Sequence, residues 1–467
     1  MRISFFGAAR LVTGSKHLIE TESGLRVLLD CGLFQGGGSD SHELNRHFGF
    51  EPASIDHVIL SHAHIDHSGL LPRLVAQGFQ GTIWATPASV DLCEIMLMDS
   101  AYIQENDMRR INERRKKRGE SILEPLYSID DVEKTLTLFR EVSYRQEKRL
   151  NDEFRFTFYD SGHIIGSAGI YMQIEEAAGR ETIFFTGDIG RKGDIILRSP
   201  EPFPQANFII CESTYGDRLH DDASKASEQL LQAVHETCVL KRGKVIIPAF
   251  SVDRTQEIIY MLDKMHSEGK LPAIEVFVDS PLSVKATQVM QKHEVDFNPE
   301  ILAYIQKDGD AFNFPGLHYV SDVEASKALN HRTEPAIIIS ASGMAEAGRV
   351  KHHIFNSIEN EKNCILIVGY ASPSSLGGAL RRGEKVVRIF GEELQVKARV
   401  EVMDAFSAHA DYEEMLDYLS CQDASKVSKL FLVHGEYDTQ LTFKGKLIEK
   451  GFYHIEIPEM GDTYEHQ

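Results

Sequence analysis

The segment S-H-A-H-I-D-H-S-G at residues 61–69 constrains this chain more than any other part of its sequence. It follows an apolar run at residues 55–60 that predicts a buried strand. Four side chains of metal-ligand type stand within six positions: His62, His64, Asp66 and His67. Alternate residues of an extended loop point to the same side, so the histidines of H-x-H can face one metal ion while the Asp-His pair faces another. The alternative, a His-rich solvated turn, is disfavoured because so dense a pattern seldom arises by chance.

Length and composition predict a globular protein of more than one domain. A chain of 467 residues exceeds the usual size of one hydrophobic core, so we expect two domains of about 200 residues each. The longest apolar runs, such as residues 364–368, have the length of a strand and are too short to span a membrane. The six cysteines show no C-x-x-C spacing and look like reduced core residues. The N-terminus reads as a strand rather than a secretory signal, which predicts a cytoplasmic location.

The charge of the chain argues against a broad surface that binds nucleic acid. The formal net charge is −20, so a polyanionic substrate must be gripped locally. The exception is the segment 107–120, which concentrates seven basic residues: Arg109, Arg110, Arg114, Arg115, Lys116, Lys117 and Arg118. Two interpretations stay open for this segment, a solvated helix end balanced by acidic neighbours and an RNA contact.

Strand and helix patterns alternate along the chain and predict an α/β fold with packed layers. In the first half we expect strands at residues 2–6, 17–20, 26–29, 58–60, 82–85, 154–159, 169–175, 182–186 and 208–211. Helical patterns cover residues 89–117 and 129–139. In the second half, parallel-type strands at residues 244–248, 275–279, 336–340 and 364–368 are separated by helical stretches, which is typical of a doubly wound sheet.

Metal-type motifs resume only near the C-terminus, at F-S-A-H-A-D (406–411) and L-V-H-G-E (432–436). The simplest arrangement is one metal domain, residues 1–212 and 404–467, interrupted by an inserted domain at residues 213–403. Three further ligand candidates stand in turns that follow strands: His163, Asp188 and His434. Alone, such a histidine is more often structural, but together with the opening motif these residues indicate a metal site.

The residues named so far match a known family. The series Asp30, His62-x-His64-x-Asp66-His67, His163 and Asp188 resembles the metallo-β-lactamase superfamily. The additional Glu212, His409 and His434 resemble its β-CASP branch of nucleases. The similarity covers essentially the whole chain and is greatest to bacterial and archaeal relatives of the endonuclease subunit in pre-mRNA cleavage and polyadenylation. The resemblance implies an αββα sandwich with a binuclear zinc site at one edge and an inserted, doubly wound β-CASP domain that caps it.

The resemblance also implies the ligands of two Zn²⁺ ions per chain. One ion would be held by His62, His64 and His163, the other by Asp66, His67 and His434, with Asp188 as the bridge. Mn²⁺ or Fe can occupy similar N/O sites, although a related diiron group has Glu where this chain has His64. Asp30 would accept a hydrogen bond from a ligand imidazole, or would instead cap the C-G-L turn that follows it.

These residues suggest a reaction. Two divalent ions can share a hydroxide and neutralise charge on a phosphoryl group, so we expect in-line attack on a phosphodiester by a metal-bridging hydroxide. His409 would be the general acid, and Glu212 would keep it protonated, unless Glu212 merely caps the next segment. The expected catalytic set is His409, Glu212, Asp188 and Asp66.

The substrate that the resemblance implies is RNA, because DNA-processing members lack histidine at the position of His434. Cleavage could be internal, from a 5′ end, or both. Candidate RNA contacts lie in strand-end loops of the inserted domain: Ser340, Ser342, Arg349, His352, Ser372 and Ser374. The alternatives are a metallo-hydrolase of small esters or lactones, and a non-catalytic RNA-binding scaffold. No membrane partner is expected, and a homodimer is one option for the assembly.

Overall fold

The computed structural model describes residues 1–36, 39–177, 179–220, 225–369, 371–372, 375–403 and 407–466. The chain forms two compact units: unit 1 comprises Met1–Leu219 and His409–Gln467, and unit 2 comprises His220–Ala408. Among the described residues, no helix combines the length and the apolar character that a membrane crossing requires. All six cysteines are free thiols, and Cys421 is the exposed one.

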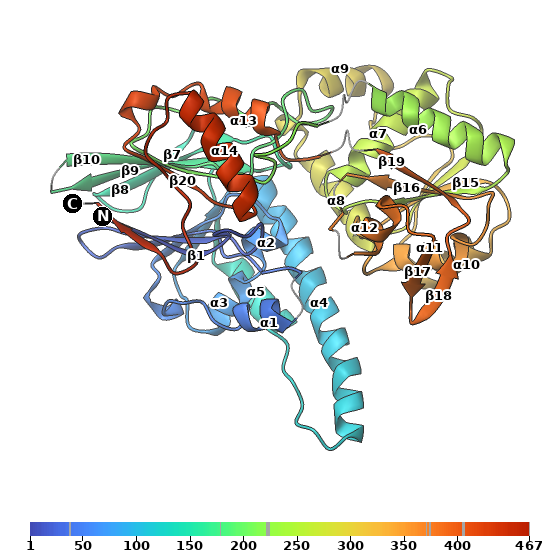
Figure 1. The fold of residues 1–467 in the computed structure, drawn as a ribbon, viewed down its shortest axis with the longest axis horizontal. Helices are drawn as coiled ribbons and strands as arrows, with labels where there is room; N and C mark the ends of the chain where they lie inside the picture. The colour runs from blue at the N-terminus through green and yellow to red at the C-terminus, as the bar shows by residue number, and fades with distance from the viewer. Residues whose placement is uncertain are drawn as a thin grey trace. The chain divides into compact units, whose positions relative to one another are not determined.

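Two seven-stranded sheets form the centre of unit 1 (Figure 1). The first sheet has the order β22 (Thr463–Glu465), β1 (Arg2–Gly7), β2 (Lys16–Glu20), β3 (Arg26–Leu29), β4 (His57–Ile59), β5 (Thr82–Ala85) and β6 (Phe139–Glu141). The second has the order β21 (Ile455–Glu456), β20 (Lys429–Leu432), β11 (Phe208–Cys211), β10 (Gly179–Phe185), β9 (Ala168–Glu176), β8 (Phe154–Asp160) and β7 (Glu147–Arg149).

The two sheets of unit 1 pack face to face because alternate strand residues are apolar and point inward. Phe5 of the first sheet and Phe156 and Ile170 of the second belong to one buried cluster. On the outer face of the second sheet, Phe184 packs with residues of α13 (Tyr412–Leu419) and α14 (Tyr437–Glu449). The helices between the strands of the first sheet are α1 (Ser39–Leu44), α2 (Ile65–Ser68), α3 (Leu71–Ala76), α4 (Pro87–Lys117) and α5 (Ile129–Thr137). Figure 1 shows α3 and α5 on the outer side of the first sheet, which confirms the predicted αββα sandwich.

Unit 2 is built on a six-stranded sheet in which the described strands all pair in parallel. Its order is β14 (Leu317–Tyr319), β13 (Glu275–Val278), β15 (Ala336–Ser340), β12 (Lys244–Pro248), β16 (Cys364–Val368) and β19 (Arg399–Met403). The central strands β12, β15 and β16 are buried along their whole length, as expected for a parallel sheet covered by helices on both faces. The doubly wound prediction is confirmed.

The remaining elements of unit 2 connect these strands. Its helices are α6 (Ala226–Val234), α7 (Arg254–Ser267), α8 (Pro281–Lys292), α9 (Pro299–Asp308), α10 (Val323–His331), α11 (Arg349–Ser357) and α12 (Leu376–Arg381). The strands β17 (Val386–Ile389) and β18 (Glu392–Gln395) form a separate antiparallel hairpin. A π-helical turn at His235–Leu240 continues α6, and short 3₁₀ turns lie at Pro52–Ser54, Glu294–Asp296 and Ala424–Lys426.

Candidate metal centre

The ends of neighbouring parallel strands bring the candidate residues of unit 1 together. In the second sheet β10, β11 and β20 are adjacent and parallel, and the turns after them carry Asp188, Glu212 and His434. In the first sheet β3 and β4 are parallel neighbours, followed by Asp30 and His62. Since parallel strands end at the same edge of a sheet, residues far apart in the sequence converge there.

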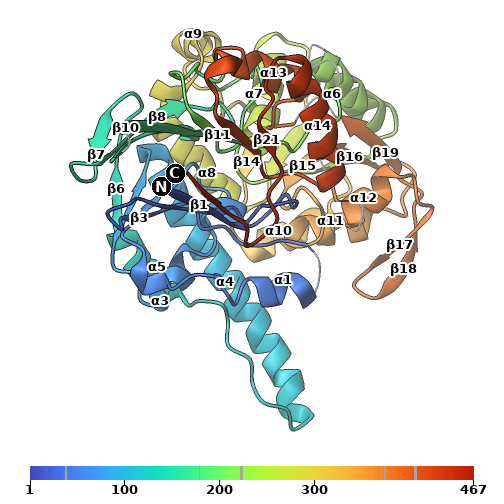
Figure 2. The ribbon, with the colours of Figure 1, turned by 60° about the vertical axis from the view of Figure 1, so that its left-hand side comes forward.

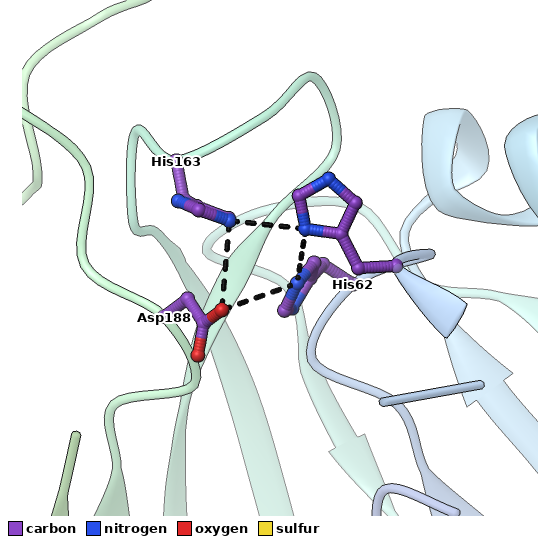
Figure 3. A group of neighbouring side chains, drawn as sticks. His62, His163 and Asp188 are labelled. Atoms are coloured by element: carbon purple, nitrogen blue, oxygen red, sulfur yellow. Dashed lines mark hydrogen bonds and ion pairs between the residues drawn. The ribbon is translucent and has the colours of Figure 1, made fainter. Parts of the chain in front are cut away.

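Four side chains form a first compact group: His62, His64, His163 and Asp188. Their candidate ligand atoms all lie within 4.8 Å of one another. His64 Nδ1 lies 3.1 Å from His62 Nε2 and 3.1 Å from His163 Nε2. Asp188 Oδ2 lies 3.6 Å from His62 Nε2 and 3.5 Å from His163 Nε2 (Figure 3). Three ring nitrogens and one carboxylate oxygen therefore surround a common point.

Asp66, His67 and His434 form a second group. His67 Nε2 lies 3.1 Å from His434 Nε2, and Asp66 Oδ2 lies 3.5 Å from His434 Nε2. The two oxygens of Asp188 divide between the groups: Oδ2 faces the first, and Oδ1 lies 3.3 Å from His67 Nε2 in the second. A carboxylate placed in this way can bridge two metal ions.

The separations of the ligand atoms fit metal binding. Two nitrogens at about 2.0–2.1 Å from one tetrahedral zinc ion lie about 3.3–3.4 Å apart, close to the separations found here. Asp188 Oδ1 is buried and accepts no hydrogen bond from the residues that the structure describes, which leaves it open to an additional partner. Burial and the neighbouring imidazoles lower the pKa of His62 well below its usual value, and burial lowers that of His64 to about 4. Both imidazoles are therefore neutral, and the neutral form is the one that can donate an electron pair to a metal ion.

Asp30 orients an imidazole of the second group. The buried Asp30 Oδ2 accepts a hydrogen bond from His67 Nδ1 at 2.7 Å, which turns His67 Nε2 toward the group. Ser61 donates to the same carboxylate, from its backbone N at 2.8 Å and from Oγ at 2.9 Å. Burial opposes the charged form of His67, but the carboxylates of Asp188 and Asp30 outweigh it and raise the pKa of His67 well above its usual value.

Glu212 and His409 lie side by side at the edge of this cluster. His409 Nδ1 lies 3.2 Å from both carboxylate oxygens of Glu212 and 3.9 Å from Asp188 Oδ2. Glu212 is held by the backbone N of Ile189 at 2.6 Å and by Thr214 Oγ1 at 2.6 Å. Burial alone would lower the pKa of His409, but Glu212 and Asp188 outweigh it and raise the pKa to about 9.

Two hydroxyl residues that the sequence did not single out belong to the same network. Thr214 Oγ1 lies 3.0 Å from His434 Nδ1 and also contacts Glu212, so it links the two. Ser61 Oγ lies 3.1 Å from His62 Nδ1 and joins that ring to Asp30. Their only signal in the sequence is position, since Thr214 stands two residues after Glu212 and Ser61 stands directly before His62.

The candidate RNA contacts lie in unit 2, and most have protein partners. Arg349 Nη1 lies 2.6 Å from Asp279 Oδ1, and Nη2 donates to the carbonyl of Ser321 at 2.6 Å. Ser340 Oγ donates to the backbone O of Asp279 at 2.7 Å. Ser342 Oγ donates to the carbonyl of Ala347 at 3.5 Å, and the exposed His352 ring lies 4.6 Å from the Phe390 ring. The Ser372 carbonyl accepts a hydrogen bond from the backbone N of Ser375. Ser374 lies outside the described residues. Their roles toward RNA stay predictions.

Three family models match successive parts of the chain. The metallo-beta-lactamase superfamily domain matches residues 18–203, the Beta-Casp domain residues 255–380, and the Zn-dependent metallo-hydrolase RNA specificity domain residues 393–458. Among solved structures, a protein of unknown function from Enterococcus faecalis is similar with a TM-score of 0.55 at 10% identity, covering 99% of both chains. That likeness shows the fold alone.

Curated relatives match over nearly the whole chain. Ribonuclease TTHA0252 from Thermus thermophilus is 35% identical, covering 99% of this chain and 99% of the relative. An RNase J-like protein from Methanocaldococcus jannaschii is 29% identical and covers 94% of both chains. Transcription termination factor FttA from Methanosarcina mazei is 28% identical over 93% of this chain and 67% of its own length. The chain therefore belongs to the RNA-processing β-CASP branch of the metallo-β-lactamase superfamily.

Proposed function

We propose that this chain is a zinc-dependent ribonuclease that hydrolyses RNA phosphodiester bonds and in which His409 is the general acid. The observation that carries the proposal is the Glu212–His409 pair, which lies beside the two groups of ligand-type residues. Metal ligands alone would serve many hydrolases, but a buried carboxylate that holds an imidazole in its protonated state supplies a proton donor that phosphodiester cleavage needs.

The two groups of residues would hold two metal ions. His62, His64 and His163 would bind one and Asp66, His67 and His434 the other, with both oxygens of the shared Asp188 engaged. Neutral imidazoles and carboxylates suit zinc, and manganese or iron can occupy similar sites. When bound, such ions supply an activated water and neutralise charge on the phosphoryl group. Asp66 and Asp188 serve catalysis by holding the ions.

His409 provides the proton for the departing oxygen. Its Nδ1 faces both oxygens of Glu212, so one proton stays between them and Nε2 remains as the ring nitrogen that can pass a proton to the substrate. The side chain of His409 is 20% exposed, whereas that of Glu212 is 1% exposed. Glu212 is therefore the positioning residue, and His409 is the group that reaches the RNA.

RNA is the substrate that the relatives support. Two relatives that cover nearly the whole chain are named Ribonuclease TTHA0252 and RNase J-like protein, and the RNA specificity domain model spans the segment that carries His409 and His434. We further propose a cytoplasmic location, because all six cysteines are free thiols, as is usual in a reducing compartment.

The proposal is tested by His409→Ala. This variant should lose RNA hydrolysis by a factor of about 10²–10⁴ while it retains the metal content of the wild-type protein. The assay uses 5′-labelled RNA and the matching DNA with products sized on a gel, and elemental analysis of the same preparations counts bound metal. As a matched control, His454→Ala removes an exposed histidine of unit 1 and should change neither quantity. Loss of metal from His409→Ala would contradict the acid assignment, and uncleaved RNA with the wild-type protein would contradict the function.

A further inference from the structure

The helix α4 is buried against unit 1 along only its first half. Every buried residue of α4 lies at or before Ala101, although the helix continues to Lys117. At a rise of 1.5 Å per residue, the part beyond Ala101 extends about 24 Å. In Figures 1 and 2 this part projects beyond the other elements of unit 1. We call it, together with the return segment 118–127, the arm.

The arm is held together by its own hydrogen bonds. Asn112 Nδ2 donates to the carbonyl of Leu123 at 2.8 Å, and Asn112 Oδ1 accepts from the backbone N of Leu123 at 2.8 Å. Arg115 Nε donates to the carbonyl of Ser121 at 2.7 Å and Nη1 forms an ion pair with Glu120 at 2.9 Å. These contacts define an inner face of the helix, which is covered by the return segment.

The opposite face of the arm carries unpaired positive charge. Arg110, Arg114 and Lys117 follow the three- and four-residue spacing of one helix face, on the side away from Asn112 and Arg115. Further exposed cations flank this face: Arg109, Lys116 and Arg118. None of these six side chains has an ion pair among the described residues. The whole chain has a net charge of −20, yet the segment 107–120 has seven basic residues against three acidic ones.

An exposed aromatic ring lies on the flank of this face that carries Arg109. Tyr102 stands seven residues before Arg109, which places both on one side of the helix, and Tyr102 is 61% exposed. Exposed arginines and lysines attract phosphates, and an exposed tyrosine offers a surface on which a base can stack. An acidic protein would satisfy the cations, but RNA also accounts for a solvent-exposed aromatic ring beside Arg109.

The base of α4 is tied to the metal centre. The side chains of Thr86 and Ser89, at the start of the helix, donate to the carbonyl of Gly166 at 2.5 Å and 2.9 Å. Gly166 lies in the turn that carries His163. The base of the helix that carries the arm is therefore linked directly to the turn that carries His163.

From these observations we propose that the outer face of the arm, formed by Tyr102, Arg109, Arg110, Arg114, Lys116 and Lys117, binds single-stranded RNA outside the metal centre. The inference rests on the ribonuclease function proposed above and assigns it a second contact with its substrate. It predicts that long RNA binds better than RNA too short to reach the arm. The helix is about 46 Å long at 1.5 Å per residue, so an RNA of about 40 nucleotides can contact the arm and the metal centre at once, whereas one of about 6 nucleotides can contact only one of them.

The first test neutralises the arm. The triple variant Arg110→Gln, Arg114→Gln and Lys117→Gln is compared in the His409→Ala background, so that RNA stays intact, by fluorescence anisotropy at several salt concentrations. We expect Kd for an RNA of about 40 nucleotides to rise about tenfold at low salt and the slope of log K against log salt to flatten by about 2. The loss should be smaller for an RNA of about 6 nucleotides, which cannot contact the arm and the metal centre at once. The charge-matched control Lys134→Gln, Arg140→Gln and Lys450→Gln, at exposed positions of unit 1, should behave like the parent.

An unchanged Kd and slope for the long RNA in the triple variant would overturn the proposal. Loss of binding to polyglutamate with unchanged RNA binding would also overturn it and would indicate an acidic protein partner instead. The thermal unfolding curves of parent and variant should coincide, because all three side chains are exposed. RNA cleavage is measured separately, with protein that retains His409. If that protein cleaves RNA but the triple variant binds RNA as tightly as the parent, the arm proposal is refuted and the ribonuclease function is not.

The second test separates stacking from charge. Tyr102→Ala should weaken binding of the long RNA about fivefold, whereas Tyr102→Phe should retain it, because phenylalanine keeps the stacking ring. Binding of inorganic polyphosphate, which has no bases, should be equal in both variants. Equal RNA binding by Tyr102→Ala and Tyr102→Phe would remove Tyr102 from the proposed surface, and equal losses for RNA and polyphosphate would show that the ring acts only through the shape of the arm.

Discussion

At the scale of single residues, the candidate centre depends on the ring nitrogens that do not face a metal ion. His67 Nδ1 donates to Asp30, His62 Nδ1 lies 3.1 Å from Ser61 Oγ, and His434 Nδ1 lies 3.0 Å from Thr214 Oγ1. Each contact fixes the rotation of a ring and leaves its other nitrogen for the centre. Such outer partners commonly determine metal affinity.

Asp30→Asn tests this arrangement. The variant keeps the size of the side chain but loses the charge that holds His67 with Nε2 directed inward, so the affinity of the second group for metal should fall about 10–100-fold. Competition with a chelator of known affinity measures this. The first group should bind as before, because Asp30 touches none of its three imidazoles directly. Asp152→Asn, at an exposed carboxylate of unit 1, is the control, and equal metal affinity in both variants would contradict the role given to Asp30.

The sequence allowed the candidate ligands to be predicted because their chemistry is rare and dense. It could not reveal Thr214 or Ser61, since hydroxyl residues beside a motif are common and their partners lie on other strands. It also could not show that the buried carboxylate of Asp279 pairs with Arg349 and accepts a hydrogen bond from Ser326 Oγ at 2.5 Å. A buried carboxylate needs such partners, and only the fold shows which side chains supply them.

At the scale of elements, close approaches of backbone hold the ligand turns in place. A Cβ atom at Gly190 would lie 1.8 Å from the carbonyl oxygen of Gly162, in the turn that carries His163. The backbone N of Gly190 donates to the carbonyl of Ser161 at 2.7 Å. The turn after β10, with Asp188, is therefore seated directly on the turn with His163, and no side chain fits between them.

Gly190→Ala should separate these two turns. The clash is with backbone, which cannot rotate away, so we expect a loss of about 2 kcal/mol or more in the free energy of unfolding together with weaker metal binding. Gly445→Ala is the matched control, because nothing lies within 4 Å of a Cβ atom there and alanine is favoured in a helix by about 0.5–1 kcal/mol. Denaturant unfolding and metal titration of both variants measure the effects, and similar behaviour of the two would contradict the packing argument.

The elements of strong apolar pattern could be predicted from the sequence, and the weak ones could not. The strands β3, β5, β11, β12, β15 and β16 have the predicted bounds. The strands β6, β7 and β18 were missed because they are short and mostly polar, and β17 was missed although three of its four residues are apolar, since only two of them are buried. In α7, Arg254 and Glu257 are buried and form an ion pair with each other. Charged residues are rarely buried without a partner, and the periodicity of apolar residues does not predict such a pair.

At the scale of the whole molecule, the candidate ligands belong to unit 1, and metal should stabilise that unit. A ligand that binds only the folded state adds about 4 kcal/mol when its free concentration is 1,000 times Kd. Zinc added to chelated protein should therefore slow amide hydrogen exchange in the strands of unit 1, with little change in β12, β15 and β16 of unit 2. Exchange mass spectrometry resolves the two sets of peptides. Equal protection of both units would mean that the metal does not act through the groups described above.

A separate prediction concerns unit 2 and its response to pH. Asp263 is 1% exposed, and neither carboxylate oxygen accepts a hydrogen bond from the described residues. Burial and the nearby Asp308 and Asp310 raise the pKa of Asp263 to about 7. The folded protein thus holds a proton that the unfolded chain releases above about pH 4, so this group makes the wild-type protein lose stability as pH rises from about 4 to about 7.

Asp263→Asn removes that loss and should stabilise unit 2 at pH 8 by on the order of 2 kcal/mol, with a gain that shrinks toward pH 4. Thermal unfolding between pH 4 and pH 8 measures the gain in stability. Glu361→Gln, at an exposed site, is the control. A gain that does not vary with pH would contradict the raised pKa of Asp263.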